Sequence, residues 1–402
     1  MKIFCALLLV GLAAGVSAGL LILIIRAMEL LAFGHVETAA TLMTDNTTPL
    51  QRFLALTLVG LVVAGGWYQL QKRLPPLTSI PQLMVGQSAS LVHNAGHAVL
   101  QMVAVGAGAS IGRETAPREL AALGASLLTK RFALDADSTR LLVACGAGAG
   151  LGASYNIPLA GAFFTLEVLL QRFDPRSVGF ALATSALATV AARFAIDDQT
   201  VYLVGAINHD LASVLLATLI GLLVALPALG FRWLSAWATR NRSRGKTQLW
   251  TLPLALMLTG LLAVWWHQIL GNGRSVAQSA YWDIGWMPAL ALLLAKALVT
   301  LLTLRAGGFG GVLTPAIALG ALAGLLVGWA GRFYLPTLDL NVATLAGSVG
   351  FLAVSMNAPL SAWAIVMGLT GQDFADQLPM LSAVGAAVLM KVWLAPKLGL
   401  EK

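Results

Sequence analysis

Long apolar runs separated by short polar stretches fill this chain of 402 residues. The first covers residues 3–33, and the others lie near 53–70, 95–111, 119–129, 141–154, 158–170, 178–195, 212–237, 251–270, 287–304, 312–333, 342–369 and 378–395. A helix needs roughly 20 apolar residues to cross a bilayer, and several runs are shorter. The first run is too long for a signal-peptide core, so we read it as an uncleaved membrane helix. The pattern predicts an all-α polytopic membrane protein with some partly spanning helices.

Two landmarks indicate an internal duplication. The sequence Ser-Tyr-Asn-Ile-Pro-Leu-Ala-Gly at 154–161 returns 201 residues later as Ser-Met-Asn-Ala-Pro-Leu-Ser-Ala at 355–362. A glycine-rich turn that ends in proline precedes each copy, at Pro117 and at Pro315. Short segments interrupted by glycine and proline at matching places in two halves are typical of discontinuous helices that meet at a midplane site. We expect one membrane domain, 1–402, with repeats at about 1–205 and 206–402.

Composition and charge narrow the class of protein. Hydrophobic residues make up 58% of the chain and charged residues 10%, whereas soluble domains carry about 25% charged residues. The formal net charge of +8 is better explained by membrane topology than by nucleic-acid binding, so no nucleic-acid partner is expected. Basic clusters predict cytoplasmic connections at 72–73, 130–140, 172–176 and 240–246, and acidic or neutral connections predict external ones at 37–45 and 197–210.

Most other polar or reactive residues carry no clear chemistry. Cys5 and Cys145 lie in apolar runs without a disulfide or zinc spacing. His93 and His97 are four residues apart, but no third ligand lies nearby, so neither a metal nor a cofactor is expected. Lys296, inside an apolar run, either adds positive potential near an anion route or extends to the membrane surface.

The strongest candidate site is the segment 106–117, which places Arg113 and Glu114 among small residues between apolar runs. Ionisable residues at membrane depth are costly and usually functional. A glycine-rich turn that enters a helix presents free backbone N–H groups to an anion. The Glu114 carboxylate could occupy that position in place of a permeating ion and swing away, as a gate does. The alternatives are a glutamate that stabilises its own helix and a surface ion pair with Arg113.

Two further helix starts offer anion contacts. The segment 307–315 leads from a glycine-rich turn into an apolar helix, where the backbone N–H groups of Val312 and Leu313 would face an anion. The segment 75–81 places the hydroxyls of Thr78 and Ser79 at another helix start. Taken alone, either hydroxyl is explained equally well as an N-cap.

Taken in order, the three segments resemble the CLC family of chloride channels and chloride/proton exchangers. The family motifs GSGIP, GREGP and GxFxP correspond to 77–81, 112–116 and 311–315, and the resemblance extends over about residues 3–395. It implies an inverted repeat of tilted, partly spanning helices, a homodimer with one anion pathway per subunit, and Glu114 as the gate. The anion-binding residues it implies are Thr78, Ser79, Ile80, Arg113, Glu114, Thr115, Val312 and Leu313.

Three departures from the family pattern bear on mechanism. The ion-coordinating serine of the family falls at Thr78, or at Ser79 if the turn shifts by one residue. The pore tyrosine expected beyond the last apolar helix is missing from 393–400. The inner acid of the exchangers aligns with Val168. Glu167 is the alternative proton path, although adjacent residues point about 100° apart around a helix.

The sequence therefore predicts transmembrane anion transport, with chloride as the favoured ion, gated by Glu114. Transport would be passive or loosely coupled to protons. The alternatives are a fluoride/proton or chloride/proton antiporter and, from another class, an integral membrane enzyme, which would need more converging polar side chains than the chain offers. Expected partners are small monovalent anions, protons, the lipid bilayer and a second copy of the chain, and the expected location is a bacterial inner membrane.

Overall fold

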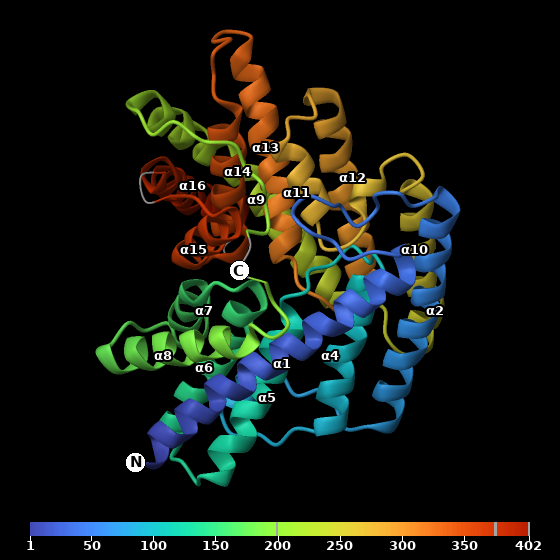
Figure 1. Ribbon diagram of the computed structural model, residues 1–402, viewed down its shortest axis with the longest axis vertical. Helices are drawn as coiled ribbons and strands as arrows, with labels where there is room; N and C mark the ends of the chain where they lie inside the picture. Colours follow the sequence, from blue (N-terminus) through green and yellow to red (C-terminus); the bar gives the residue numbers. More distant parts are fainter. Residues whose placement is uncertain (198–199, 374–375, 401–402) are drawn as a thin grey trace.

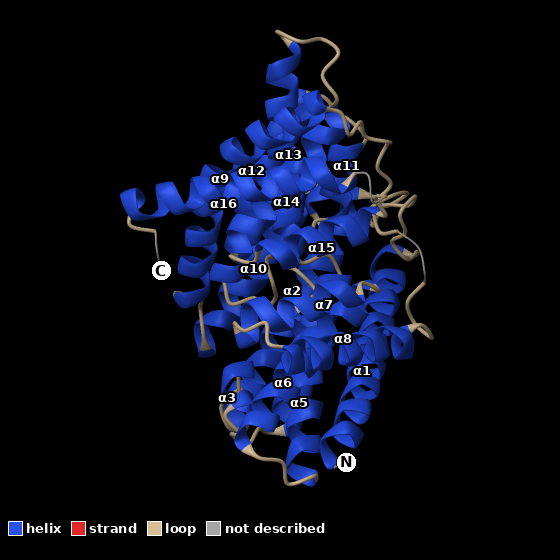
Figure 2. Ribbon diagram, turned by 90° about the vertical axis from the view of Figure 1, so that its left-hand side faces the viewer, coloured by secondary structure: helices blue, strands red, loops and turns tan. Residues whose placement is uncertain are grey.

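The computed structural model describes residues 1–197, 200–373 and 376–400. Residues 198–199 of the predicted external connection 197–210 lie outside the described residues. The regular elements of the described chain are helices, and its β-type pairing is a single isolated bridge between Gly112 and Gly311. The expected all-α class is confirmed, as the helical ribbon of Figure 2 shows.

Sixteen α-helices are found in the described chain. Those of the first half are α1 (Lys2–Phe33), α2 (Pro49–Arg73), α3 (Ile80–Met84), α4 (Leu91–Gly106), α5 (Thr115–Arg131), α6 (Ala136–Tyr155), α7 (Pro158–Phe164) and α8 (Pro175–Ala192). Those of the second half are α9 (Leu211–Arg240), α10 (Gln248–Leu262), α11 (Arg274–Tyr281), α12 (Trp286–Arg305), α13 (Leu313–Arg332), α14 (Leu340–Met356), α15 (Pro359–Thr370) and α16 (Gln377–Leu398). A π-helix, η1 (Thr165–Leu170), continues α7.

Helix lengths differ widely, as the apolar runs predict. Six described helices are long and apolar enough to cross a membrane, namely α1, α2, α9, α12, α13 and α16. The apolar segments α7–η1, α14 and α15 are shorter. In Figure 1, α1 runs obliquely across the other helices of the first half, near α5 and α6. The chain is therefore a multi-pass membrane protein with full-length and partial spans.

Local sequence explains where several helices begin. Asp135, Asp174 and Asp210 are N-caps, and each accepts a hydrogen bond from the backbone N–H of the serine three residues later. Hydrogen bonds from that serine lower the pKa of all three aspartates. The same cap chemistry therefore starts one helix after another where the chain turns between apolar runs.

Close backbone contact holds the second half together. At Gly320, Gly324 and Gly347, a Cβ atom would overlap the backbone of the facing helix, so α13 and α14 approach closely only because these residues are glycines. Small residues serve this purpose in membrane helices, where van der Waals contact replaces hydrophobic exclusion from water. The packed helices fix the orientation of the N-terminus of α13, which forms part of the site described below.

Matching landmarks in the two halves adopt the same local structure. Asn156 ends α6 in the left-handed conformation at φ 58°, and Asn357 ends α14 in the same way at φ 56°. A proline then starts α7 and α15, and these two helices pack against each other (Figure 1). The two halves therefore share this type of helix junction.

Candidate functional site

Two glycine-rich turns, one from each half, meet at the centre of the site. Gly112 and Gly311 exchange backbone hydrogen bonds with N···O distances of 2.7 and 3.1 Å. Gly112 precedes α5 and Gly311 precedes α13, so the pairing brings the N-termini of these helices together. The second and third sequence motifs, about 200 residues apart in the chain, therefore form one structure.

The Glu114 carboxylate lies on the N-terminus of α13. Its Oε1 atom accepts a hydrogen bond from the backbone N–H of Leu313 at 2.8 Å. Its Oε2 atom lies 3.5 Å from the hydroxyl of Tyr155, which in turn pairs with the Thr314 hydroxyl at 2.8 Å. Glu114 is only 1% exposed. A carboxylate therefore occupies a helix N-terminus of the kind that binds anions.

Glycine is required on both sides of this carboxylate. A Cβ atom at Gly112 or at Gly311 would overlap the carboxyl group of Glu114. The two turns thus leave a space that the carboxylate fills, with the Leu313 N–H group at one end. Any larger residue at either glycine would have to displace Glu114.

Two arginines flank Glu114 without forming an ion pair with its carboxylate. The Arg113 guanidinium lies over the Tyr155 ring, 4.9 Å from its centre. Arg118 donates to the backbone carbonyl of Glu114 and to the Thr115 hydroxyl, both at 3.1 Å. Fixed positive charge therefore lies nearby, while the carboxylate itself is held by an amide and a hydroxyl.

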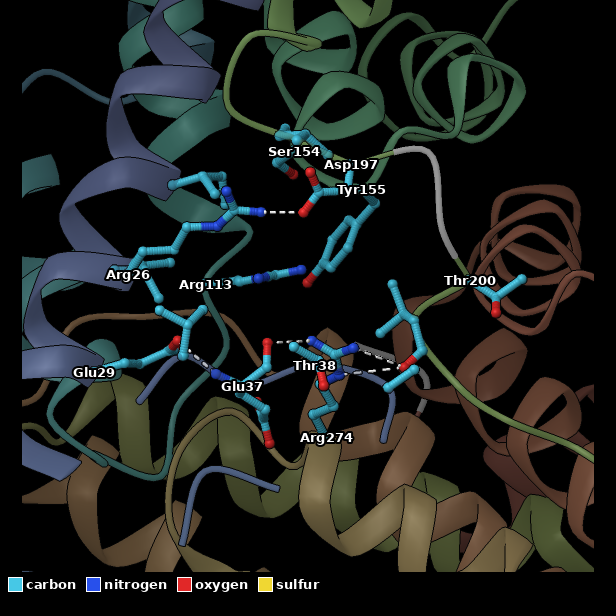
Figure 3. A pocket seen from close by; sticks show the side chains of 16 residues that line it. Arg26, Glu29, Glu37, Thr38, Arg113, Ser154, Tyr155, Asp197, Thr200 and Arg274 are labelled. Atoms are coloured by element: carbon cyan, nitrogen blue, oxygen red, sulfur yellow. Dashed lines mark hydrogen bonds and ion pairs between the residues drawn. The ribbon is translucent and has the colours of Figure 1, made fainter. Parts of the chain in front are cut away.

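A cavity of about 350 Å³ opens beside Arg113 and Tyr155, next to Glu114. Three arginines and three acids line it, namely Arg26, Arg113, Arg274, Glu29, Glu37 and Asp197. Figure 3 shows Arg26 paired with Asp197 at 2.7 Å, Arg113 beside Tyr155, and Arg274 reaching the carbonyl groups of Glu37 and Val201. Because 37–45 is a predicted external segment, we interpret the cavity as the outer approach to Glu114.

The first motif lies apart from this contact set. Thr78 is half-buried and its hydroxyl lies 3.4 Å from the Ser88 carbonyl oxygen. Ser79 is exposed, and its hydroxyl and backbone N–H both donate to Gln82 in a capping box at the start of α3. Ile80, half-buried, is the first residue of α3. In the described part of the chain, neither hydroxyl makes a hydrogen bond to Glu114, and Val312 is the N-cap of α13.

Glu167 lies on η1 and binds the N-terminus of α15. Its carboxylate accepts hydrogen bonds from the backbone N–H groups of Leu360 at 3.1 Å and Ser361 at 2.9 Å, and from the Ser361 hydroxyl at 2.7 Å. Val168, where the family acid would lie, packs against the hydrophobic core. The side chain that was the alternative proton path is therefore engaged in joining the two halves.

Lys296 is fully buried and does not extend to the membrane surface. Its ammonium group donates to the carbonyl oxygens of Ile269 at 2.8 Å and Gly271 at 2.7 Å. The backbone N–H of Gly271 donates to the carbonyl oxygen of Gly108, in the turn before Glu114, at 2.8 Å. Lys296 thus holds a loop that contacts the turn leading to Glu114.

Tyr155 and an inner polar cluster are not predicted from the sequence. Tyr155 directly follows Ser154 of the repeated segment, a position that the sequence pattern gives no reason to single out. The cluster consists of Gln101 and His97 on α4 with Glu119 on α5; Gln101 donates to the Glu119 carboxylate at 2.8 Å. The spacing of Asn94, His97 and Gln101 on one face of α4 was a signal for it. The described residues include no group of three or more His, Cys, Asp or Glu side chains able to hold a metal.

Known proteins of similar sequence are bacterial chloride channels by name. Voltage-gated ClC-type chloride channel ClcB of Citrobacter koseri is 29% identical over 374 residues, which cover 89% of this chain and 87% of that protein. ClcB of Salmonella typhimurium is 28% identical over 412 residues, covering 96% and 95% of the two chains.

Solved structures show the same fold. A slow cyanobacterial Cl⁻/H⁺ antiporter aligns with a TM-score of 0.82 at 20% identity, covering 100% of this chain and 97% of the other. A CLC-type fluoride/proton antiporter aligns with a TM-score of 0.73 at 21% identity, covering 97% and 96%. The family model described as voltage gated chloride channel matches residues 81–391. The chain therefore belongs to the voltage gated chloride channel family, a family of membrane channels and transporters.

Proposed function

We propose that the protein carries chloride across the membrane along a pathway that Glu114 closes. The observation that carries the proposal is the hydrogen bond from the Leu313 N–H group to the Glu114 carboxylate at the N-terminus of α13. A carboxylate at that amide takes the place of an anion, so transport requires Glu114 to leave. Partial charges at helix ends bind an anion less tightly than a fixed buried cation would, which allows release.

The anion proposed is chloride, and its further contacts are the residues of the three motifs. The relatives named chloride channels support chloride. The fluoride/proton antiporter shares the fold at 21% identity, which leaves fluoride as the alternative ion. Besides the Leu313 amide, the pathway would use the Thr78 or Ser79 hydroxyl near Ile80, and the Val312 amide. Arg113 and Thr115 would border it.

We further propose that transport is at most loosely coupled to protons. Val168 offers no protonatable group, and two backbone N–H groups of α15 and the Ser361 hydroxyl already engage the Glu167 carboxylate. Proton delivery to Glu114 from the inner side therefore lacks the acid expected from the family resemblance. Tight chloride/proton or fluoride/proton exchange is the alternative.

The first prediction tests the gate by replacing Glu114 with alanine. The variant protein, reconstituted in vesicles, should carry chloride faster than the native protein, and its flux should no longer respond to external pH. Removing the carboxylate frees the Leu313 amide and removes the group that protons compete for. The matched control is Glu37→Gln, which changes a carboxylate in the same outer cavity without touching that amide. Flux that stays pH-dependent in Glu114→Ala would show that Glu114 is not the gate.

The second prediction concerns the first motif. Replacing both Thr78 and Ser79 with alanine should weaken chloride binding or change the chloride/nitrate preference, because a hydrogen bond to an ion contributes roughly 1.5–3 kcal/mol. The single variants Thr78→Ala and Ser79→Ala then tell which hydroxyl contributes; the Ser79 hydroxyl already donates to Gln82. Calorimetric chloride titration and a nitrate competition assay are the measurements. Native affinity and preference in the double variant would exclude this motif from the pathway.

The molecular setting of this function is also a proposal. We infer a homodimer with one pathway per subunit, two structural repeats at about 1–205 and 206–402, and a bacterial inner membrane as the location. The family resemblance supports the dimer. The matching ends of α6 and α14 and the contact between α7 and α15 support the repeats.

A further inference from the structure

A stripe of buried polar side chains runs along α4 toward the gate. Asn94, His97 and Gln101 are spaced three and four residues apart, so they share one helix face. Asn94 and His97 are no more than 3% exposed, and Gln101 is completely buried. The helix begins next to the segment 85–90, whose Gln87 and Ser88 contact the basic residue Lys130, and ends at Gly106 before the gate turn. The stripe therefore leads from the predicted cytoplasmic side to the centre of the protein.

Glu119 faces this stripe from α5, the helix that Glu114 precedes. Its carboxylate accepts a hydrogen bond from Gln101 at 2.8 Å and lies 3.8 Å from Nε2 of His97. The side chain is 21% exposed, so protein encloses most of it. Glu119 follows Glu114 by five residues, a rise of about 7.5 Å along a helix, so a chain of water molecules would have to connect the two carboxyl groups.

The partners of Glu119 suit a carboxyl group that changes its protonation state. A glutamine amide donates through its nitrogen to a carboxylate and, when flipped, accepts through its oxygen from a carboxylic acid. The structure shows the donating arrangement, which leaves the buried Oε1 atom of Gln101 without a hydrogen-bond partner. The buried Oδ1 atom of Asn94 also has no partner. Buried acceptors normally have a partner, so these atoms are positions for water or for a protonated group.

Among the described residues, Glu119 forms no direct ion pair with an arginine or a lysine, although the charges of Arg118 and Arg242 act on it from a distance. The guanidinium of the neighbouring Arg118 is directed to the Glu114 carbonyl and the Thr115 hydroxyl. Arg242, from the loop after α9, lies over the Phe309 ring, 4.3 Å from its centre. Burial and the nearby Arg244 lower the pKa of Arg242 to about 10, so it remains charged at neutral pH and does not exchange protons there. His93, one turn before His97, is bound to the Pro75 carbonyl.

We propose that Glu119, together with His97 and Gln101, is an internal proton-binding site that supplies Glu114 from the cytoplasmic side. This proposal rests on the proposed function, because it needs Glu114 to be the gate. A proton from water on the cytoplasmic side joins the Glu119 carboxylate, beside the neutral His97 and the Gln101 amide; it then passes through water to the Glu114 carboxylate, and Glu119 returns to its ionised form. Only O–H bonds change, and one proton moves in each step.

The test is Glu119→Gln in vesicles that carry a chloride gradient, with chloride flux and internal pH recorded together. We expect proton flux to fall by about tenfold or more, as for loss of a positioned acid–base group, while chloride flux persists. The amide can still pair with Gln101, so the variant keeps the local structure. The matched control is Glu167→Gln, which changes a carboxylate engaged by α15 and should leave proton flux intact.

A second readout does not depend on transport. Difference infrared spectra of the native protein between high and low pH should contain a band from a protonated carboxyl group. Glu119→Gln should remove this band, and His97→Gln should change the pH at which it appears. Native proton flux in Glu119→Gln, or chloride flux without any proton movement in the native protein, would overturn the inner site but leave the gate in place. If chloride flux lost its pH response in Glu119→Gln but kept it in Glu114→Ala, the proposal that Glu114 is the gate would be wrong, and the inner site would fall with it.

Discussion

At the scale of single residues, Gly311 controls whether Glu114 can rest on the amide of Leu313. The carboxyl group lies where a Cβ atom of residue 311 would be, and the same holds on the other side at Gly112. The position of the Glu114 carboxylate therefore depends on the absence of a side chain at residues 112 and 311 as much as on the glutamate itself. A glycine motif in this turn serves the close approach of a side chain as well as backbone flexibility.

The third prediction follows from this contact. Gly311→Ala should expel the Glu114 carboxylate, because the new methyl group and the carboxyl group cannot share one space. Loss of a charge-assisted hydrogen bond worth roughly 1.5–3 kcal/mol corresponds to a roughly 10- to 100-fold shift toward the open gate. The rate of chloride flux in vesicles measures this shift.

The control for this variant is Gly65→Ala, where an added Cβ meets no atom within contact distance. It should transport like the native protein. If Gly311→Ala kept native flux and native pH response, the closed position of Glu114 described here would be wrong.

At the scale of elements, the N-terminus of α15 depends on a residue from the other half of the chain. The first N–H groups of a helix have no partner within it. Two of those in α15, at Leu360 and Ser361, donate to the Glu167 carboxylate from η1. The π-helical turn that carries Glu167 is a type of distortion often found at functional positions. In this protein the π-helical turn directs the Glu167 carboxylate toward the N-terminus of α15, and this contact joins α7–η1 to α15.

The fourth prediction is that Glu167 stabilises the fold and does not carry protons. Glu167→Ala should lower the free energy of unfolding by roughly 1–3 kcal/mol, because it leaves backbone donors without an acceptor. Glu167→Gln retains an acceptor oxygen and should cost less. Thermal unfolding in detergent measures the difference. Equal stability of both variants and the native protein, combined with lost proton flux, would make Glu167 part of a proton path.

At the scale of the whole molecule, orientation in the membrane decides which side supplies each ion. The basic connection 240–246 and the acidic segment 37–45 are predicted to lie on opposite sides. The outer cavity beside Glu114 includes Glu37, Thr38 and Ala39 of the latter segment. The polar stripe of α4 begins on the side of the basic residue Lys130. Anions from outside and protons from inside would therefore reach Glu114 from different directions.

The fifth prediction tests this orientation with single cysteines in a Cys5→Ser background, since Cys5 is exposed in the native chain. Lys246→Cys should resist an impermeant thiol reagent added outside intact cells, because positive connections stay in the cytoplasm. His209→Cys, in an exposed position of the opposite connection, is the control and should react. Labelling of the first variant but not the second would invert the topology.

Much of this protein could be read from its sequence because the bilayer imposes simple rules. Backbone groups in hydrocarbon must be paired within helices, so apolar runs alone predict an all-α protein and most of its spans. The repeated Asn-x-Pro-Leu segments at 156–159 and 357–360 correctly located matching helix junctions. The sequence also indicated the glycine-rich turns around Glu114 and before Leu313. Glu114 is easily noticed because an acidic residue at membrane depth is costly.

Only the tertiary structure decided which of these groups meet. Gly112 and Gly311 pair across about 200 residues of chain, and this pairing places Glu114 on the Leu313 amide. Glu167 binds the N-terminus of α15, and Lys296 donates to two loop carbonyl groups. Glu119 accepts a hydrogen bond from Gln101 and lies beside His97. Periodicity fixes the helix face on which a side chain lies but not the helix that packs against that face, because that choice depends on contacts between distant segments.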